Sequence, residues 1–269
     1  FKKVVIADTF ALWANVGFGT NRILTFFEAW ATSLSYTFQL YFDFSGYTDM
    51  ALGIALMFNI LLPLNFNSPY KALNIQDFWR RWHMTLSRFL RDYIYIPLGG
   101  NKRSEIKTYA NLFTVFLVGG LWHGASWMFV IWGALHGIAI VIHRIWQHFG
   151  QKMHTWLAWF ITFNFVNITW VLFRAETWDK ALNILQGMVG LQGIMLDRGL
   201  AKSLAFMTKY GVLFGNFLDD NNVGSGSLKA ALVAIIFTVW AKNSQEWLPR
   251  FRPNYKYFLF TIIVMFWSI

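Results

Sequence analysis

The sequence predicts an all-α protein, a polytopic transmembrane helical bundle that includes re-entrant and amphipathic helices. Of its 269 residues, 56% are hydrophobic and only 13% are charged, whereas a soluble domain carries about 25% charged residues. Aromatic residues make up 20% of the chain, and such side chains anchor proteins at lipid–water boundaries. The composition excludes an ordinary soluble globular protein. The absence of cysteine excludes disulfides, thiolate zinc sites and cysteine nucleophiles.

Seven apolar segments are candidate membrane helices, because a spanning helix needs roughly 20 mostly apolar residues and fewer when neighbours bury it. Several are short, which favours tilted or re-entrant helices. The chain begins at Phe1 and stops inside an apolar run, so we expect a partial membrane domain over residues 1–269 that is truncated at both ends. The segments are 23–41, 47–64, 109–122, 127–142, 155–173, 228–241 and 257–269.

In a soluble protein the net charge of +10 would suggest binding to nucleic acid. In this apolar chain it indicates membrane topology, because cytoplasmic loops of membrane proteins are enriched in Lys and Arg. The stretch 71–107 holds eight Lys and Arg against three acidic residues. Placing this stretch in the cytoplasm puts the other basic loops on the same side and a neutral segment, 174–227, outside. The sequence thus obeys the positive-inside rule, and no nucleic-acid partner is expected.

The basic stretch also contains a predicted amphipathic helix over residues 75–93. Its apolar residues recur with a period near 3.6, and Asp77, Arg81 and Arg88 occupy the opposite face. Such a helix lies in the headgroup plane or packs under the bundle.

His123 is the strongest candidate for chemistry. The apolar stretch 109–142 is too long for one crossing and short for two, so we expect the chain to break near His123 inside the membrane. Broken backbone at that depth lines a cavity. An imidazole there can act as a general base at neutral pH. The alternative is a packed histidine that hydrogen-bonds to a neighbouring helix.

The amphipathic helix supplies further candidates. His83 lies on the border between its apolar and basic faces, where it could reach a pore or remain an interfacial histidine. Four arginines could hold the phosphates of a cytoplasmic donor such as coenzyme A. Alternatively, they only keep this stretch on the cytoplasmic side and bind anionic lipid. They are Arg80, Arg81, Arg88 and Arg91.

Asp43 and Asp49 lie between the first two apolar segments, where they could orient a histidine, line a funnel or cap the following helix. His136 follows His123 by 13 residues and could ligate haem with it, although no second pair completes a bis-histidine set. The sequence contains no Walker loop, GxSxG, GxGxxG or carboxylate-rich metal cluster. The common hydrolase, nucleotidase and dinucleotide-binding functions are therefore excluded, and no metal site is expected.

Five ordered motifs resemble the membrane-bound O-acyltransferase family, in particular the bacterial alginate O-acetyltransferase membrane-subunit type. The resemblance extends from about residue 1 to residue 145, with the signature motifs between 41 and 127. The motifs are YFDFSGYTDMA (41–51), NFNSPY (65–70), DFWRRWHMTLS (77–87), RDYIYIPLGG (91–100) and GGLWHGASW (119–127).

The resemblance implies a bundle around a tunnel that carries an acyl group from a cytoplasmic thioester towards an acceptor hydroxyl. His123 matches the family's catalytic histidine and His83 matches its second motif position. Asp43, Trp122 and Ser126 are expected to line the tunnel or orient substrate. Because the chain has no cysteine, the acyl group passes directly from donor to acceptor or is carried by a group other than a thiol. In the direct version His123 removes the acceptor proton, while His83 orients the donor or stabilises the oxyanion.

The bacterial branch implies a multi-pass protein of the bacterial inner membrane, embedded in lipid. Its donor would be acetyl-CoA or another acyl thioester, with no bound cofactor. Its partners would be a periplasmic SGNH-type acetyltransferase and a polysaccharide acceptor, alginate-like or another glycan. The competing interpretation is a transporter or channel with His123 in the substrate or proton path.

Overall fold

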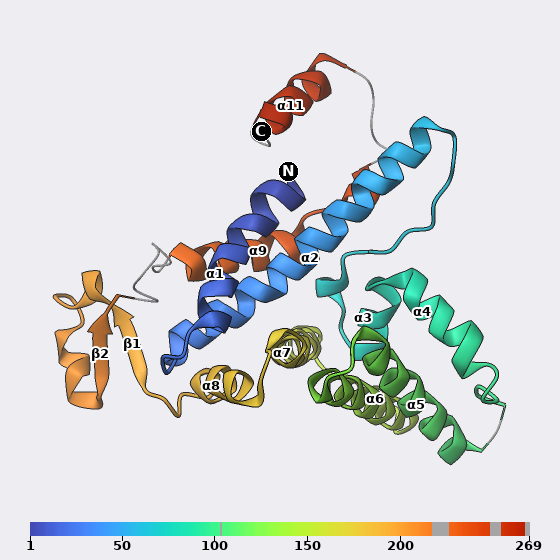
Figure 1. The fold of residues 1–269 in the computed structure, drawn as a ribbon, viewed down its shortest axis with the longest axis horizontal. Helices are drawn as coiled ribbons and strands as arrows, with labels where there is room; N and C mark the ends of the chain where they lie inside the picture. Colours follow the sequence, from blue (N-terminus) through green and yellow to red (C-terminus); the bar gives the residue numbers. More distant parts are fainter. Residues whose placement is uncertain (103, 217–225, 248–253, 267–269) are drawn as a thin grey trace. The chain divides into compact units, whose positions relative to one another are not determined.

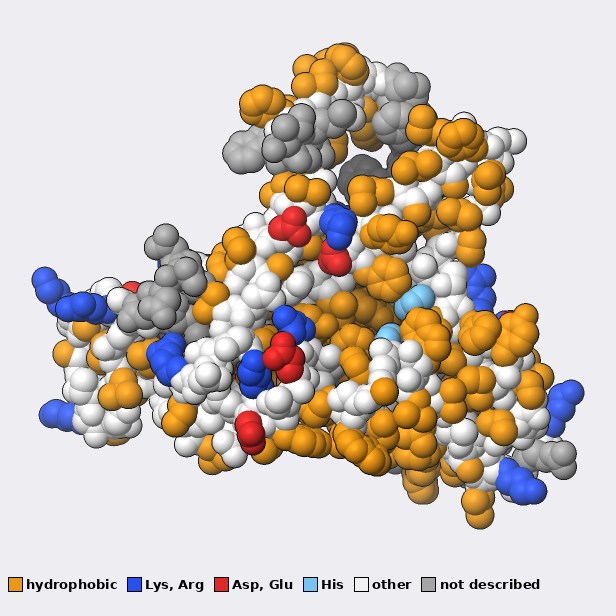
Figure 2. Space-filling model, viewed as in Figure 1, with side chains coloured by type: hydrophobic (Ala, Val, Ile, Leu, Met, Phe, Trp, Pro, Cys, Tyr) orange, Lys and Arg blue, Asp and Glu red, His pale blue; other side chains and the backbone are white. Residues whose placement is uncertain are grey.

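The computed structural model describes residues 1–102, 104–216, 226–247 and 254–266. Over these residues the chain is mostly helical (Figure 1), which confirms the predicted helical membrane protein. Within the described part, the helices α6 (Trp127–His148) and α7 (Thr155–Arg174) are long and apolar enough to cross a membrane. Figure 2 shows hydrophobic side chains exposed over much of the drawn face, as lipid contact requires.

Contacts divide the chain into two compact units, residues 1–59 with 174–269 and residues 60–173, and each is described separately. The first unit is built around one long helix, with a shorter helix against it. Its elements are the π-helix η1 (Lys2–Ala7), α1 (Asp8–Gly19), α2 (Phe26–Met57), α8 (Trp178–Met188), β1 (Ile194–Asp197), the 3₁₀ helices η4 (Arg198–Leu200) and η5 (Ala205–Tyr210), β2 (Val212–Gly215), α9 (Gly226–Trp240), α10 (Ser244–Trp247) and α11 (Tyr255–Phe266).

The helix α2 corrects the prediction of two separate segments, 23–41 and 47–64. It runs without interruption through the polar residues that were expected to join them. Asp43 therefore lies within the helix and forms an ion pair with Lys3 of η1, and Asp49 binds Lys2 Nζ at 2.8 Å. Because these carboxylates are compensated and no proline intervenes, the helix has no reason to end. Neither aspartate caps a following helix.

The start of α2 is fixed by a capping box. The Thr25 hydroxyl and backbone N–H both donate to Glu28 Oε2, at 2.7 and 3.0 Å. The Glu28 side chain is fully buried, and its other oxygen accepts from Arg22 Nη2 at 2.5 Å. A buried carboxylate needs this compensation, because an unpaired charge in the interior is costly.

A small parallel sheet is the only departure from the all-α prediction in the described ranges. Ile194 pairs with Val212 and Asp197 with Gly215, so β1 and β2 run side by side over four residues each. The sheet lies within the segment 174–227, which the sequence analysis treats as an external connection.

The second unit contains the candidate chemical residues. Its helices α5 and α6 lie side by side (Figure 1). Its elements are the 3₁₀ helix η2 (Pro69–Lys71), α3 (Ile75–Arg81), α4 (Met84–Leu90), the π-helix η3 (Arg91–Tyr95), α5 (Glu105–His123), α6 and α7.

The predicted amphipathic helix 75–93 is wrong as one continuous element. The chain forms α3 and α4 with a break at His83, whose backbone is left-handed at φ 42°. Asn65 stabilises the break from outside, because its carbonyl accepts from Met84 N–H at 3.0 Å and its side-chain oxygen accepts from Thr85 N–H at 3.2 Å. His83 is thus the residue that precedes α4 rather than one on the border between two helix faces.

Glycine permits the close approach of α5 and α6. A Cβ on Gly120 would lie 2.3 Å from Phe129 O, and a Cβ on Gly133 would lie 2.4 Å from Phe116 O. Both contacts are with backbone of the facing helix, so only glycine fits at these two positions.

The remaining predicted apolar segments coincide with helices to within a few residues at most ends. α7 matches 155–173 and α9 matches 228–241, whereas α6 extends six residues beyond the predicted end at 142. The last predicted span, 257–269, corresponds to α11, and its residues 267–269 lie outside the described part.

Candidate functional site

His123 is the last residue of α5, at the predicted break in the chain. Gly124 and Ala125 connect it to α6, and Ser126 caps that helix by accepting from Met128 N–H at 3.3 Å. α5 thus ends at His123 and α6 begins four residues later, at Trp127, which confirms that the apolar stretch breaks into two helices at this point.

Aromatic rings surround the half-buried His123 imidazole. The rings of Trp122 and Phe173 lie 4.9 Å from it, that of Trp132 lies at 5.3 Å and that of Phe129 at 6.2 Å, all between centroids. No hydrogen bond or ion pair joins this imidazole to any residue that the structure describes. The cage thus holds the ring by packing, and its nitrogens have no hydrogen-bond partner among the described residues.

His83 is positioned by hydrogen bonding. Its Nδ1 lies 3.3 Å from Asn65 Oδ1, an oxygen that also accepts from the Thr85 hydroxyl at 2.6 Å. Because an amide oxygen only accepts, this contact assigns the proton of a neutral ring to Nδ1. Burial lowers the pKa of His83, so the neutral ring is favoured at pH 7.

The two candidate histidines belong to the same unit and are near neighbours. His83 and His123 lie close enough for a charge on one to act on the other. The left-handed backbone at His83 turns the chain between α3 and α4.

His136 has a structural role. It is fully buried, its Nδ1 accepts from Trp79 Nε1 at 3.2 Å and its Nε2 lies 3.0 Å from Thr169 Oγ1. The Thr169 hydroxyl donates to Val166 O at 2.9 Å, so it must accept from His136. With both ring nitrogens used, His136 offers no lone pair to an iron, and the geometry does not support the haem interpretation.

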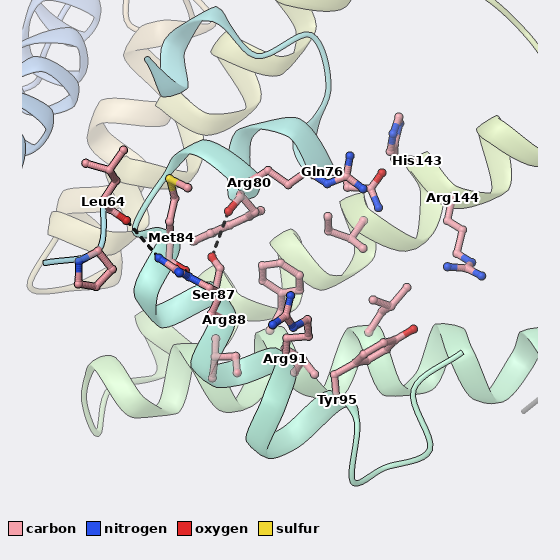
Figure 3. Close-up of a pocket in the computed structure, with 17 residues that line it drawn as sticks. Leu64, Gln76, Arg80, Met84, Ser87, Arg88, Arg91, Tyr95, His143 and Arg144 are labelled. Carbon is pink, nitrogen blue, oxygen red and sulfur yellow. Dashed lines mark hydrogen bonds between the residues drawn. The ribbon is translucent and has the colours of Figure 1, made fainter. Parts of the chain in front are cut away.

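A cavity of about 790 Å³ opens between α3, α4, η3, α5 and α6 (Figure 3). Its walls are mostly apolar, and its charged lining comes from Arg80, Arg88, Arg91 and Arg144. No Asp or Glu is among its lining residues. A cavity of this size with apolar walls and a few charged groups is typical of a small-molecule site.

Arg81 does not line this cavity. Its Nε donates to Asp77 Oδ1 at 2.9 Å and its Nη1 to Asn67 O at 3.3 Å. Three of the four arginines proposed from the sequence thus reach the cavity, and the fourth stabilises α3 by an ion pair one turn apart.

The cavity wall is connected to His123 through edge-to-face contacts between aromatic rings. Trp79 lines the cavity, and its ring lies 5.7 Å from that of Trp132, which in turn contacts His123. The same Trp79 donates its indole N–H to His136. A tryptophan layer therefore joins the basic cavity to the histidine cage.

The three residues expected to line a tunnel or orient substrate lie in different surroundings. Trp122 is 60% exposed and borders the His123 cage. Ser126 is the cap of α6. Asp43 belongs to the other unit, where Lys3 is its ion-pair partner.

His143 and Arg144 were not among the candidate residues predicted from the sequence. Both line the cavity from α6, as does Ile140. Their spacing of three and four residues from Ile140 is the signal that could have placed them on one helix face. No group of three potential metal-ligand side chains occurs among the described residues.

Comparison with known proteins gives consistent matches. A family model described as the membrane-bound O-acyltransferase family matches residues 15–176. Peptidoglycan O-acetyltransferase of Helicobacter pylori is 55% identical over 256 residues, which cover 91% of this chain and 47% of that protein. Probable alginate O-acetylase of Pseudomonas aeruginosa is 49% identical over 188 residues, which cover 70% of this chain and 36% of that protein.

A more distant similarity extends to a third polymer-modifying protein. Teichoic acid D-alanyltransferase of Bacillus subtilis is 35% identical over 156 residues, which cover 52% of this chain and 40% of that protein. The chain spans about half the length, or less, of the curated relatives it matches.

Proposed function

The chain belongs to the membrane-bound O-acyltransferase family, and on that basis we propose that it is part of a membrane-embedded O-acyltransferase. The whole protein, a multi-pass protein of the bacterial inner membrane, passes an acetyl or other acyl group from a cytoplasmic thioester towards hydroxyls of a cell-surface polysaccharide. The observation that carries this proposal is His123, held in an aromatic cage at the α5–α6 break with no protein partner among the described residues.

In this proposal His123 is the general base. It takes the proton of the acceptor hydroxyl as that oxygen attacks the thioester carbonyl carbon. The tetrahedral intermediate collapses, the C–S bond breaks, and the thiolate takes the proton back from the imidazolium, so proton and leaving group balance. A positioned base contributes about 10²- to 10⁴-fold to such a step. Without cysteine in the chain, an acyl-thiol intermediate on this segment is excluded.

His83 is proposed as a residue that orients the donor. A neutral ring with its proton on Nδ1, directed to Asn65, has only an acceptor at Nε2. Stabilising an oxyanion would require the protonated ring, which burial disfavours. Of the two roles expected from the sequence, orientation therefore fits the geometry better.

The basic cavity is proposed as the donor site. Guanidinium groups bind phosphate through planar pairs of N–H donors, and Arg80, Arg88 and Arg91 supply such groups. The apolar walls suit the uncharged arm of acetyl-CoA or a related thioester. No metal or other bound cofactor is required by this scheme.

The acceptor and the partner are proposed from the relatives. Their names refer to peptidoglycan, alginate and teichoic acid, three bacterial envelope polymers. We therefore propose an envelope polysaccharide as final acceptor, reached through a periplasmic SGNH-type acetyltransferase that receives the acyl group.

A transporter is the second candidate, favoured by the broken helices at His123 and the basic cavity. The two functions are separated by supplying purified full-length protein in liposomes with labelled acetyl-CoA, the SGNH-type acetyltransferase and the polymer acceptor. The proposal expects thioester consumption matched by label on the acceptor. Movement of a solute with no thioester consumed would contradict it.

A further inference from the structure

His136 is a fully buried histidine that the proposed reaction does not use. It connects three helices of the second unit, because it lies on α6, accepts from Trp79 Nε1 of α3 at 3.2 Å and lies 3.0 Å from Thr169 Oγ1 of α7. An indole nitrogen only donates, so His136 Nδ1 carries no proton and Nε2 is the donor to Thr169. The lone pair on Nδ1 is occupied by Trp79, so this ring is suited to holding other groups rather than to moving protons.

Trp79 is held through both its backbone and its indole. Its carbonyl oxygen accepts from the Ser87 hydroxyl of α4 at 3.0 Å, and its indole N–H is bound by His136. The neighbouring Trp132 packs against Trp79, and Trp170 stacks on Trp132. The indole nitrogens of Trp132 and Trp170 are buried and lack a hydrogen-bond partner in the described ranges. Of these three indoles, Trp79 is therefore the one whose orientation is fixed by a hydrogen bond.

The orientation of Trp79 matters because its ring has different neighbours on its two sides. Trp79 lines the basic cavity. Its ring also lies 5.7 Å from that of Trp132, which lies 5.3 Å from the His123 imidazole, both between centroids. A displaced Trp79 would alter the cavity wall and the packing of the His123 cage together. Misplacing reacting groups by about 1 Å can lower a rate about 100-fold.

We propose that His136 is a positioning residue for acyl transfer, because it holds the Trp79 indole in the orientation that aligns the donor thioester with His123. This inference rests on the proposed function, and it adds to it a residue that touches neither donor nor acceptor. Since His136 acts through Trp79 and the charged groups of the cavity are not altered, its loss affects kcat more than the KM of the donor.

Two substitutions separate the two hydrogen bonds of His136. The amide oxygen of His136→Asn takes the place of Nδ1 and still accepts from Trp79. The amide nitrogen of His136→Gln takes the place of Nε2, so it still donates to Thr169 but leaves Trp79 without an acceptor. His136→Gln should lower kcat at least about tenfold and change the KM for acetyl-CoA less than about threefold, whereas His136→Asn should keep kcat within about threefold of the wild type.

The assay measures thioester consumption by full-length protein in liposomes with acetyl-CoA, the SGNH-type acetyltransferase and the polymer acceptor, relative to the amount of folded protein. Trp79→Phe keeps the ring and removes its N–H. It should therefore reproduce the loss in His136→Gln, and the double variant should lose no more than either single variant, because both remove the same hydrogen bond.

Trp159→Phe is the matched control. Trp159 Nε1 donates to Tyr70 O at 2.9 Å, and Trp159 does not line the cavity. This variant loses the same kind of hydrogen bond and should lower the melting temperature like Trp79→Phe, but it should leave kcat unchanged. If His136→Gln does not fold, the comparison of Trp79→Phe with Trp159→Phe decides, because neither changes His136.

The outcomes are distinguishable. Coupled losses of kcat in His136→Gln and Trp79→Phe, with kcat kept in His136→Asn, support the proposal. Equal kcat in the two His136 variants, or additive losses in the double variant, would overturn it, since a histidine that only stabilises the core would behave in that way. No thioester consumption by the wild type would overturn the proposed function and this inference with it, whereas transfer with uncoupled variants would overturn the inference alone.

Discussion

Replacing Gly120 with alanine tests whether the close contact between α5 and α6 positions His123. A Cβ at Gly120 would lie 2.3 Å from Phe129 O, about 1 Å inside ordinary contact distance, and the clashing atom is backbone. No rotamer change can relieve it, so α6 must move away. Overpacking of this kind costs about 1–3 kcal/mol, offset by about 1 kcal/mol of better helix propensity in alanine.

The control is Gly53→Ala, an exposed helical glycine with open space around it. It gains the same propensity without the clash, so the difference between the variants isolates the overpacking cost. Thermal unfolding of full-length protein should place Gly120→Ala several degrees below Gly53→Ala, at about 2–4 °C per kcal/mol. Acyl transfer should fall by up to about 100-fold, because His123 follows three residues later and a 1 Å displacement can cost that much. Equal melting temperatures with unchanged transfer would refute the reasoning.

Three further predictions use single side chains. Because burial lowers the pKa of His83, the unfolded chain binds a proton at this histidine more tightly than the folded protein does, so stability falls as the pH drops below about 6.5. The variant His83→Gln should therefore lose less melting temperature than the wild type between about pH 7.5 and 5. His136→Ala removes both ring hydrogen bonds and should cost about 2–5 kcal/mol in denaturant unfolding, while the wild type shows no haem absorption band. Glu28→Gln should cost about 1–3 kcal/mol by the same measurement, whereas the exposed Glu176→Gln should change nothing measurable.

Segments governed by local composition were predictable from the sequence. α6 and α7 are predominantly apolar, so their type and position follow from hydropathy alone. The break at Gly124 was predictable for the same reason, because the length of the apolar stretch is incompatible with one crossing or two.

The errors arise where a partner distant in the sequence changes the local outcome. The polar residues within α2 are compatible with a continuous helix only because Lys2 and Lys3 compensate Asp49 and Asp43. The bend at His83 depends on Asn65, 18 residues earlier. Periodicity analysis is blind to both interactions.

Only part of the lining of the basic cavity could be predicted from the sequence. Charge in the stretch 71–107 identified Arg80, Arg88 and Arg91. The predicted shared face of Asp77 and Arg81, four residues apart, was the sign that Arg81 forms an ion pair within α3. His143 and Arg144 are close to the other arginines only through the packing of α6 against α3, which no local pattern encodes.

The central claim, that His123 is the base in acyl transfer, is tested most directly by the acetyl content of the envelope polysaccharide in cells expressing full-length His123→Ala. The account predicts that acetylation is lost while the protein reaches wild-type level in the membrane. Unchanged acetylation at that protein level would contradict it.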